Sequence, residues 1–202
     1  SNEYGELGYV TTTSRLEPVS VSSLTSVSQI GQGAVHSCAL LSNTRVVCWG
    51  SNSVGQLGDG TTTNRVAPVL ASGLISISQI TVGDRSSCAL STDQTVKCWG
   101  SNSSGQLGDG TTTDRLTPVL VSGLSGVVET SLGDNHSCAL LTDRTVKCWG
   151  TNWYGQLADG GTLNQLTPKV VVGVSNADRL SVGDNHSCVA LVDGTVKCWG
   201  SN

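Results

Sequence analysis

Apolar and polar residues alternate over short stretches of this chain, and the alternation predicts β-strands. Within residues 136–149 it assigns to one face Cys138, Leu140, Val146 and Cys148, and to the other face Ala139, Leu141 and Trp149. Both faces are largely apolar, as expected where a sheet is sandwiched between two neighbouring sheets. No segment repeats its apolar residues with the 3.6-residue period of a helix over a sufficient length to predict one. The pattern therefore predicts an all-β fold.

Residues 101–150 hold four strand candidates in succession. Leu116–Val121 contains a proline, which suits an edge strand, and Val127–Leu132 is a second apolar run. The hairpin His136–Trp149 supplies two more strands, while residues 101–110 hold three glycines and predict a tight loop with positive φ angles. Four short antiparallel strands per module are typical of a propeller blade.

The same unit of fifty residues recurs four times without a gap. The second and third units are identical at 33 of 50 positions, which predicts one supersecondary module stacked side by side. We therefore expect a β-propeller, or a propeller segment, in a single repeat domain spanning residues 1–202. Its repeats are residues 1–50, 51–100, 101–150 and 151–200, and residues 201–202 start a fifth.

Composition and charge narrow the class of function. Charged residues make up 13% of the chain, the net charge is −4, and lysines and arginines form no run. Nucleic-acid binding depends on a basic stripe, so we expect no nucleic-acid partner. The longest apolar stretch, Pro168–Val174, is too short to span a bilayer and contains a lysine. We therefore expect no membrane insertion.

Eight cysteines fall into four pairs of constant spacing: Cys38/Cys48, Cys88/Cys98, Cys138/Cys148 and Cys188/Cys198. A hairpin centred on residue 43 places the first pair in opposed positions, within reach of a disulfide. No Cys-x-x-Cys motif is present, which argues against zinc or a redox pair. Reduced, buried thiols are the alternative. Disulfides are preferred, and they predict an oxidising compartment: extracellular, cell-surface or periplasmic.

The repeat resembles the regulator-of-chromosome-condensation repeat family. The family pattern, Trp-Gly-x-Asn-x-x-Gly-Gln-Leu-Gly-x-Gly followed by proline and then Gly-x-x-His-Ser-x-Ala-Leu, is matched here by Trp99, Gly100, Asn102, Gly105, Gln106, Leu107, Gly108, Gly110, Pro118, Gly133, His136, Ser137, Ala139 and Leu140. The resemblance covers the whole chain and implies a β-propeller. It implies little about function, because the family includes exchange factors, ubiquitin-ligase domains, a photoreceptor and secreted inhibitors.

Departures from the family pattern narrow the choice of function. The added cysteines resemble those expected of a secreted branch of the family, in which a disulfide links two strands of each blade. Repeats of equal length leave no room for the projecting hairpin of the family's exchange factor. The photoreceptor's tryptophan-bearing segment is replaced by Gly83–Ser87, Gly133–Ser137 and Gly183–Ser187, which contain no tryptophan. A secreted propeller that binds another protein, similar in kind to the propeller-type β-lactamase inhibitor, fits best.

Histidines and aspartates recur with the repeat, and we interpret them as structural. Histidine precedes Ser-Cys at His36, His136 and His186, but the second repeat has Ser86 there. A Ser-His-Asp triad is assembled once from separate segments, not copied into each blade. Each Asp-Gly turn supplies a single acid, whereas calcium needs several converging oxygens. We therefore expect no catalytic residue, no metal site, no cofactor and no enzymatic activity.

An aromatic pair, Trp153 and Tyr154, occurs only in the fourth repeat. The tryptophans that end each hairpin are expected to lie between blades, but a pair that breaks the repeat is typical of a residue that anchors a partner. We therefore expect a non-enzymatic, secreted or cell-surface scaffold that binds protein. The alternatives are a subunit of an extracellular fibre or surface layer, which binds further copies or repeats of itself, and a lectin-like propeller that binds glycan.

The sequence predicts one blade whose strands are divided between the two ends of the chain. The chain begins and ends at Ser-Asn, between the third and fourth strands of a blade. Residues 174–202 would supply three strands, and residues 1–22 could supply the fourth. The family resembles seven-bladed rings, which at this period need about 350 residues. We therefore expect part of a longer chain or assembly, in preference to a four-bladed ring closed on itself.

Overall fold

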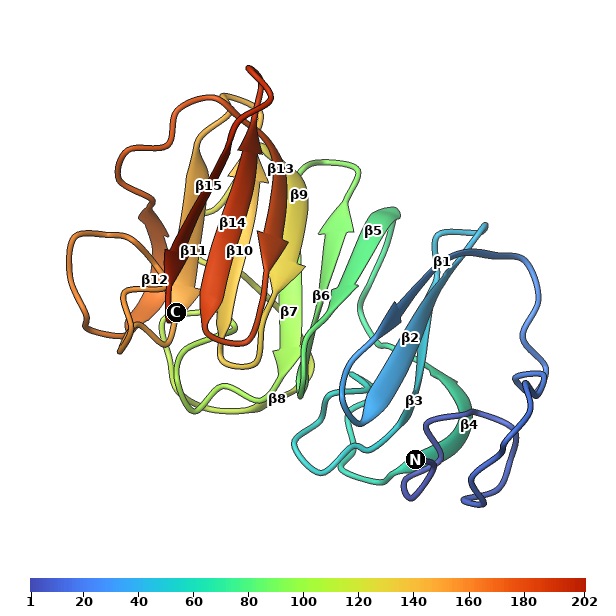
Figure 1. Cartoon of the computed structure of the whole chain (residues 1–202). Helices are drawn as coiled ribbons and strands as arrows, with labels where there is room; N and C mark the ends of the chain where they lie inside the picture. Colours follow the sequence, from blue (N-terminus) through green and yellow to red (C-terminus); the bar gives the residue numbers. More distant parts are fainter.

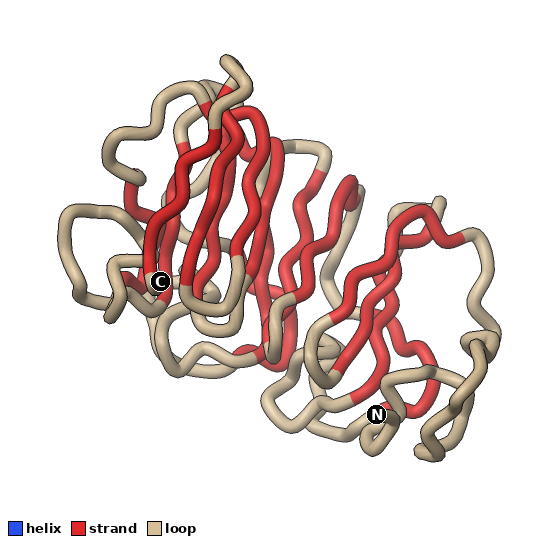
Figure 2. Tube along the Cα trace, in the orientation of Figure 1, coloured by secondary structure: helices blue, strands red, loops and turns tan.

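The computed structural model describes all residues, 1–202, and consists of strands and loops. Fifteen strands form four separate antiparallel sheets, which we call the first to fourth blades. The blades stand side by side in an open arc, with the N-terminus beside the first blade and the C-terminus on the fourth (Figure 1). Figure 2 shows that loops occupy both ends of every blade. The fold is a segment of a β-propeller, as the sequence predicts.

The first three blades have four strands in chain order, and the fourth has three. The strands are β1 (Val27–Gln32), β2 (His36–Leu41), β3 (Val46–Gly50) and β4 (Arg65–Leu70); β5 (Ile77–Val82), β6 (Ser86–Ser91), β7 (Val96–Gly100) and β8 (Arg115–Leu120); β9 (Val127–Leu132), β10 (His136–Leu141), β11 (Val146–Gly150) and β12 (Gln165–Val170); and β13 (Ala177–Val182), β14 (His186–Leu191) and β15 (Val196–Gly200). The structure contains no helix that is long and apolar enough to cross a membrane.

Strand positions follow the sequence pattern closely. The expected strand Val127–Leu132 is β9, and the proline-containing strand, expected one residue later, is the edge strand β8. In the loop before β8, Gly108 has φ +70°, and a Cβ atom there would lie 2.7 Å from Nε1 of Trp149. This position therefore needs glycine both for its backbone conformation and for the close approach of the indole.

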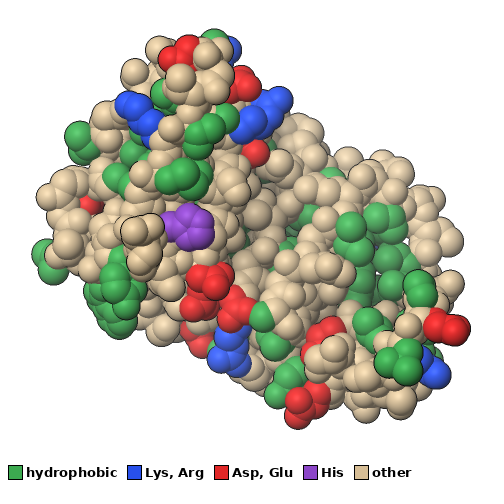
Figure 3. Space-filling model, viewed as in Figure 1, with side chains coloured by type: hydrophobic (Ala, Val, Ile, Leu, Met, Phe, Trp, Pro, Cys, Tyr) green, Lys and Arg blue, Asp and Glu red, His purple; other side chains and the backbone are tan.

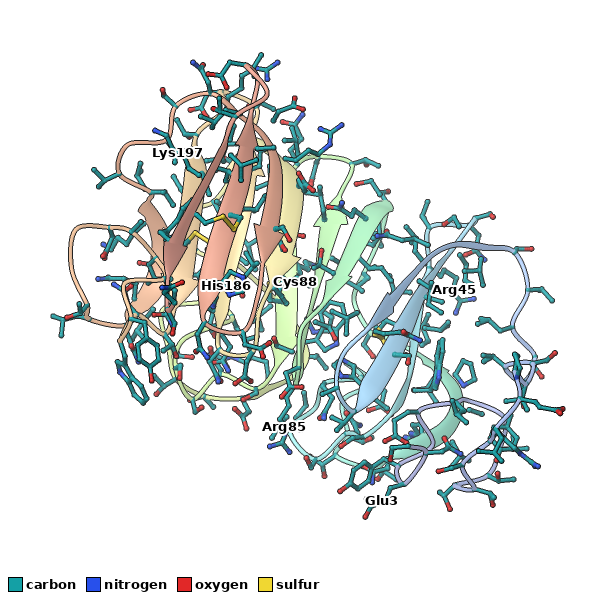
Figure 4. The ribbon with its side chains drawn as sticks, viewed as in Figure 1. Glu3, Arg45, Arg85, Cys88, His186 and Lys197 are labelled. Carbon is teal, nitrogen blue, oxygen red and sulfur yellow. A yellow bond between two sulfur atoms is a disulfide. The ribbon has the colours of Figure 1, made fainter.

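All four cysteine pairs form disulfides, and no cysteine is free. Each pair is directly opposed in its hairpin, as Cys38 in β2 is opposite Cys48 in β3. Figure 4 shows the sulfur atoms between the strands. The intra-blade pairing predicted from the spacing is confirmed.

The hydrophobic core lies between blades and not within them. Leu40 and Val46 of the first blade pack with Ile80 and Trp99 of the second. Trp49, Trp99 and Trp149 are at most 1% exposed. The first strands of neighbouring blades contact one another, which places β1, β5, β9 and β13 on the inner side of the arc. Each blade is thus stabilised by its neighbours, as in other repeat proteins.

The fourth blade lacks a fourth strand, as the repeat phase predicts. Residues 1–22 are irregular and lie against the first blade, where Nε1 of Trp49 donates to the carbonyl of Glu6 (2.8 Å) and the Val10 amide donates to the carbonyl of Val66 (3.0 Å). They do not pair with β15. The self-closed four-bladed ring is therefore not formed.

Candidate protein-binding surface

The loop between β11 and β12, residues 151–164, is held by one buried asparagine. Asn152 accepts a hydrogen bond from the amide of Leu157 at Oδ1 (3.0 Å). Its Nδ2 donates to Oδ1 of Asp159 and to the carbonyl of Gly161, both at 3.0 Å. The side chain of Asn152 is fully buried, so these contacts fix the loop from inside.

Trp153 projects from this fixed loop with 71% of its surface exposed. The equivalent residues Ser53 and Ser103 are also exposed, although both belong to internal repeats. The exposure of Trp153 is therefore a property of the position and does not result from a missing neighbour. Leu163 of the same loop is 77% exposed. Figure 3 shows apolar side chains on the side of the molecule where the β11–β12 loop lies.

Tyr154 differs from Trp153 in one respect. It is 58% exposed, but its counterparts Val54 and Ser104 are half-buried. Tyr154 therefore lies at the margin of the exposed surface formed by Trp153 and Leu163. Sequence reasoning also missed Tyr4, a half-buried tyrosine at the same repeat position. A comparison of residue 4 with residue 154 in the aligned repeats identifies it.

The fourth-repeat loop carries less positive charge than its counterparts. In the second repeat, Arg65 forms an ion pair with Asp59 (2.7 Å), and Arg115 forms the same pair with Asp109 in the third (2.6 Å). Burial alone would raise the pKa of Asp59, but hydrogen bonds from Thr61 and Arg65 hold it below its ordinary value. These contacts occupy both carboxylate oxygens of the aspartate.

The fourth repeat has Gln165 in place of the arginine. Its Nε2 donates to Oδ2 of Asp159 (2.9 Å), so the turn is kept without the cation. The result is a rigid loop with two exposed apolar side chains, Trp153 and Leu163, and no exposed cation.

The buried histidines join blades to one another. His36 in β2 is hydrogen-bonded through Nε2 to the hydroxyl of Ser87 in β6 (2.8 Å), and His136 in β10 likewise to Ser187 in β14 (2.9 Å). Burial lowers the pKa of both histidines to about 4. The sequence pattern predicted a structural role for these histidines, but it did not reveal that they bridge neighbouring blades.

The recurring aspartates meet these histidines through the backbone, Asp84 at His36 and Asp184 at His136, and not through their carboxylates. Asp84, Asp134 and Asp184 line one depression of about 370 Å³, and Figure 3 shows acidic side chains on the lower part of the visible face. Burial, with the charges of Asp84 and Asp184, raises the pKa of Asp134. Asp134 accepts a hydrogen bond from Asn135 (2.6 Å), whereas His136 is bonded to a serine. The hydrogen-bond order of a Ser-His-Asp triad is not assembled.

Two sequence models of the regulator of chromosome condensation (RCC1) repeat match the chain. They cover residues 1–40, 45–90 and 95–140 in one case, and 27–56, 77–106, 127–156 and 178–202 in the other. The chain belongs to the RCC1 repeat family. This confirms the resemblance found in the repeat motifs. No match was found among curated protein sequences.

Several solved structures are similar to this chain. Human WBSCR16 is 24% identical with a TM-score of 0.86, over 98% of this chain and 54% of that protein. Yeast RCC1 (Prp20) from Saccharomyces cerevisiae is 21% identical with a TM-score of 0.80, over 91% and 48%. The receptor kinase CR4 ectodomain from Physcomitrella patens is 21% identical with a TM-score of 0.58, over 88% and 43%. These likenesses establish the fold, and the chain spans about half the length of each relative.

Proposed function

We propose that this chain is a non-enzymatic propeller that binds another protein in an oxidising compartment, with Trp153 as the central contact. A tryptophan that is 71% exposed on a rigid loop carries the proposal. Aromatic anchors supply much of the binding energy at protein interfaces. A loop that is already ordered loses little conformational entropy when it binds. Tyr154 and Leu163 extend the contact on either side.

The chemistry of the loop favours a partner with an uncharged, apolar cleft. Trp153 and Leu163 offer apolar surface, and the replacement of arginine by Gln165 removes the cation found in the other repeats. The indole N–H adds one hydrogen-bond donor at the rim of such a cleft. Asp159 has no arginine partner in this loop, so an acidic partner surface is disfavoured there.

Two observations support a binding role over an enzymatic one. The buried histidines are bonded to serines of neighbouring blades, and the Asp-Gly turns use their carboxylates internally. Among the structural relatives, yeast RCC1 has been solved bound to Kap60, and its binding to Gsp1p and histones has been described. These partners are proteins, and they belong to that relative.

The disulfides support the proposed compartment. Every cysteine is paired, and disulfides of this density are rare where glutathione keeps thiols reduced. A location outside the cell, at its surface or in a periplasm agrees with this chemistry. The CR4 relative is itself an ectodomain of a receptor kinase.

The glycan-binding alternative receives less support. One shallow site per blade would need a stacking aromatic in each loop, but Ser53 and Ser103 occupy the position of Trp153 in the second and third repeats. We therefore retain protein as the partner.

A capture experiment tests this function. The chain is immobilised and exposed to the secreted and surface proteins of its native source, beside the variants Trp153→Ser and Ser103→Ala. We expect Trp153→Ser to weaken binding of the captured protein by about 2 kcal/mol, the loss typical of a hot-spot aromatic, or about 30-fold. Ser103→Ala is the matched control and should bind as the wild type does. Equal binding by Trp153→Ser would reject this loop as the contact.

A further inference from the structure

A polar cavity of about 400 Å³ lies at the end of the blades that carries the β3–β4 loop. Arg85 extends from this end of the molecule (Figure 4). The cavity is lined by the loop 1–14, the turn before β2, the β3–β4 loop and the turn before β6, through Tyr4, Val35, Ser51, Ser53, Asn64 and Arg85. None of these residues is acidic. Its volume lies within the range of about 300 to 1,000 Å³ that is usual for small-molecule sites.

The loop 1–14 packs on the first blade as the internal loops pack on theirs. A Cβ atom at Gly5 would lie 2.7 Å from the Cα atom of Val66, and one at Gly55 would lie 2.6 Å from the Cα atom of Leu116. Asn2 at the base of the loop is fully buried, as its counterparts in the other loops are. The cavity is therefore formed by loops in their regular positions and not by the open face of a blade.

Arg85 is the lining residue that departs most from the repeat. Asn135 occupies its position in the third blade, where Oδ1 accepts a hydrogen bond from Nε2 of Gln106 (3.1 Å). Arginine has no acceptor, so Nε2 of Gln56, the counterpart of Gln106, donates only to Ser51 (3.2 Å). The second repeat thus gives up an internal hydrogen bond for an exposed cation, which the fold of the third repeat does not need.

The guanidinium of Arg85 is not neutralised within the molecule. Its Nη2 donates to Oγ of Ser53 (2.9 Å), and none of the four ion pairs includes it. Arg85 acts to lower the pKa of Asp134, but burial and two neighbouring aspartates raise that pKa overall. Since Arg85 has no close carboxylate, its remaining N–H groups are free for a ligand.

The neighbouring polar side chains use their acceptors inside the protein and keep donors for the cavity. Oγ of Ser51 accepts from a glutamine amide (3.2 Å), and Oδ1 of Asn64 accepts from a backbone amide (2.8 Å). Oγ of Ser53 accepts from Arg85. The Asn64 Nδ2 group and the serine hydroxyl hydrogens are left for a ligand. A ligand rich in acceptor oxygens satisfies such a site.

No equivalent junction between repeats carries the same set of residues. One repeat further along, Val54, Asp114 and Asn135 stand in place of the tyrosine, the amide and the arginine. Two repeats along, Ser104 and Asn185 replace the tyrosine and the arginine. The combination therefore occurs once, and the repeat alone does not account for it.

We propose that this cavity binds the carboxylate of a small ligand, with Arg85 as the ion-pair partner and Ser53 and Asn64 as hydrogen-bond donors. A planar guanidinium matches both oxygens of a carboxylate. The half-buried ring of Tyr4 offers apolar surface to the carbon skeleton of the ligand. The volume suits a ligand of about one sugar or one amino-acid residue. This site is separate from Trp153 and does not depend on the protein partner proposed there.

Heteronuclear NMR titration tests the site with two probes, D-glucuronate and N-acetylglutamate, which carry the carboxylate on a sugar and on an amino acid. We expect saturable shifts at Ser53, Asn64 and Arg85, with Kd on the order of 1 mM for the tighter probe, and none with glucose. The tighter probe identifies the source of the carboxylate. No saturable shift with either probe would overturn the proposal, and so would equally tight binding of inorganic phosphate.

Two variants taken from the repeat itself test the assigned residues. Arg85→Asn introduces the residue of the third repeat, and Asn64→Asp introduces the residue found as Asp114, which still accepts the backbone amide there (2.7 Å). Both should fold, and Arg85→Asn should keep its stability in urea because the new amide can accept from Gln56. We expect each variant to weaken binding of the tighter probe by about tenfold or more.

Arg45→Asn is the matched control for the loss of one positive charge. Arg45 is exposed in the β2–β3 turn, at the opposite end of the blade (Figure 4), so this variant should bind as the wild type does. Equal losses in Arg45→Asn and Arg85→Asn would mean that net charge, and not the cavity, attracts the probe. Unchanged binding by Arg85→Asn would reject Arg85 as the ion-pair partner.

Discussion

Single residues set how neighbouring blades recognise each other. Gln29 bridges to the next blade by two hydrogen bonds, with Nε2 donating to the carbonyl of Ile80 and Oε1 accepting from its amide, both at 2.9 Å. Glu129 occupies the same position at the interface between the third and fourth blades, and it accepts only from the amide of Leu180 (3.2 Å). An ionised carboxylate cannot donate, so half of the bridge is lost. Burial accordingly raises the pKa of Glu129.

Glu129→Gln should stabilise the protein at pH 7. The amide restores the missing donor, which is worth about 1 kcal/mol for one net hydrogen bond. Because the folded-state pKa of Glu129 is raised, its ionisation lowers stability as the pH rises, and the gain should fade in acid as the wild-type carboxyl becomes protonated. Urea unfolding at pH 7 and pH 4 measures both effects. The reciprocal control, Gln29→Glu, should destabilise at pH 7.

The buried histidines make folding stability depend on pH. His36 and His136 have pKa values of about 4 in the fold, below the ordinary value of 6.5. Below pH 6.5 the unfolded chain binds protons that the folded chain does not. Stability is therefore complete above pH 6.5 and falls towards pH 4, by about 2 kcal/mol per histidine at pH 5.

Urea unfolding between pH 7.5 and pH 5 measures this slope, and the variant His136→Ser tests its origin. Serine is the residue at the same position of the second repeat, Ser86, so the substitution should be tolerated. We expect a loss of about 1 kcal/mol at pH 7.5, from one hydrogen bond, and a shallower pH dependence. An unchanged slope would assign the pH dependence to other groups.

At the scale of strands and loops, the sequence pattern predicted most of the elements. Alternation and turn residues located β9, the hairpins and the disulfides, because these depend on neighbours close in sequence. Residues 15–20 resemble β8 in sequence but are irregular. A strand requires a hydrogen-bonded neighbour, and no strand is paired with these residues. The local sequence pattern could not predict the His36–Ser87 hydrogen bond either, because this bond joins two repeats.

One loop position offers a test of packing that the repeats themselves contain. Gly108 contacts Trp149, which is fully buried, whereas Ala158 occupies the same position in the fourth repeat with φ 45°, beside the half-exposed Trp199. Ala158→Gly should therefore stabilise by about 1 kcal/mol, by relieving the backbone. Gly108→Ala should destabilise by more than that, because Trp149 has no room to shift.

Thermal or urea unfolding ranks these two variants against Gly123→Ala. Gly123 has φ +64°, but a Cβ atom there would meet open space, so only the backbone penalty applies. We expect Gly108→Ala to lower stability more than Gly123→Ala does. Equal losses would mean that the indole contact contributes nothing.

At the scale of the whole molecule, stability is distributed along the arc. Each blade is stabilised by the faces of its neighbours, so the terminal blades have one supporting interface and the internal blades have two. The repeat count and strand phase were predictable from sequence. The proposed partner surface was only partly predictable from sequence. The exposure of Trp153 and the half-burial of Val54 and Ser104, the counterparts of Tyr154, depend on how the repeats pack in space.

The four disulfides should therefore differ in their resistance to reduction. Cys48, Cys98 and Cys148 are fully buried, whereas Cys198 is exposed on the outward face of the fourth blade. Thiol exchange needs access to sulfur, so dithiothreitol should reduce Cys188–Cys198 before the other three bridges. Timed alkylation and peptide mass spectrometry follow each bridge. Equal rates for all four bridges would contradict the idea that burial between blades protects the other three.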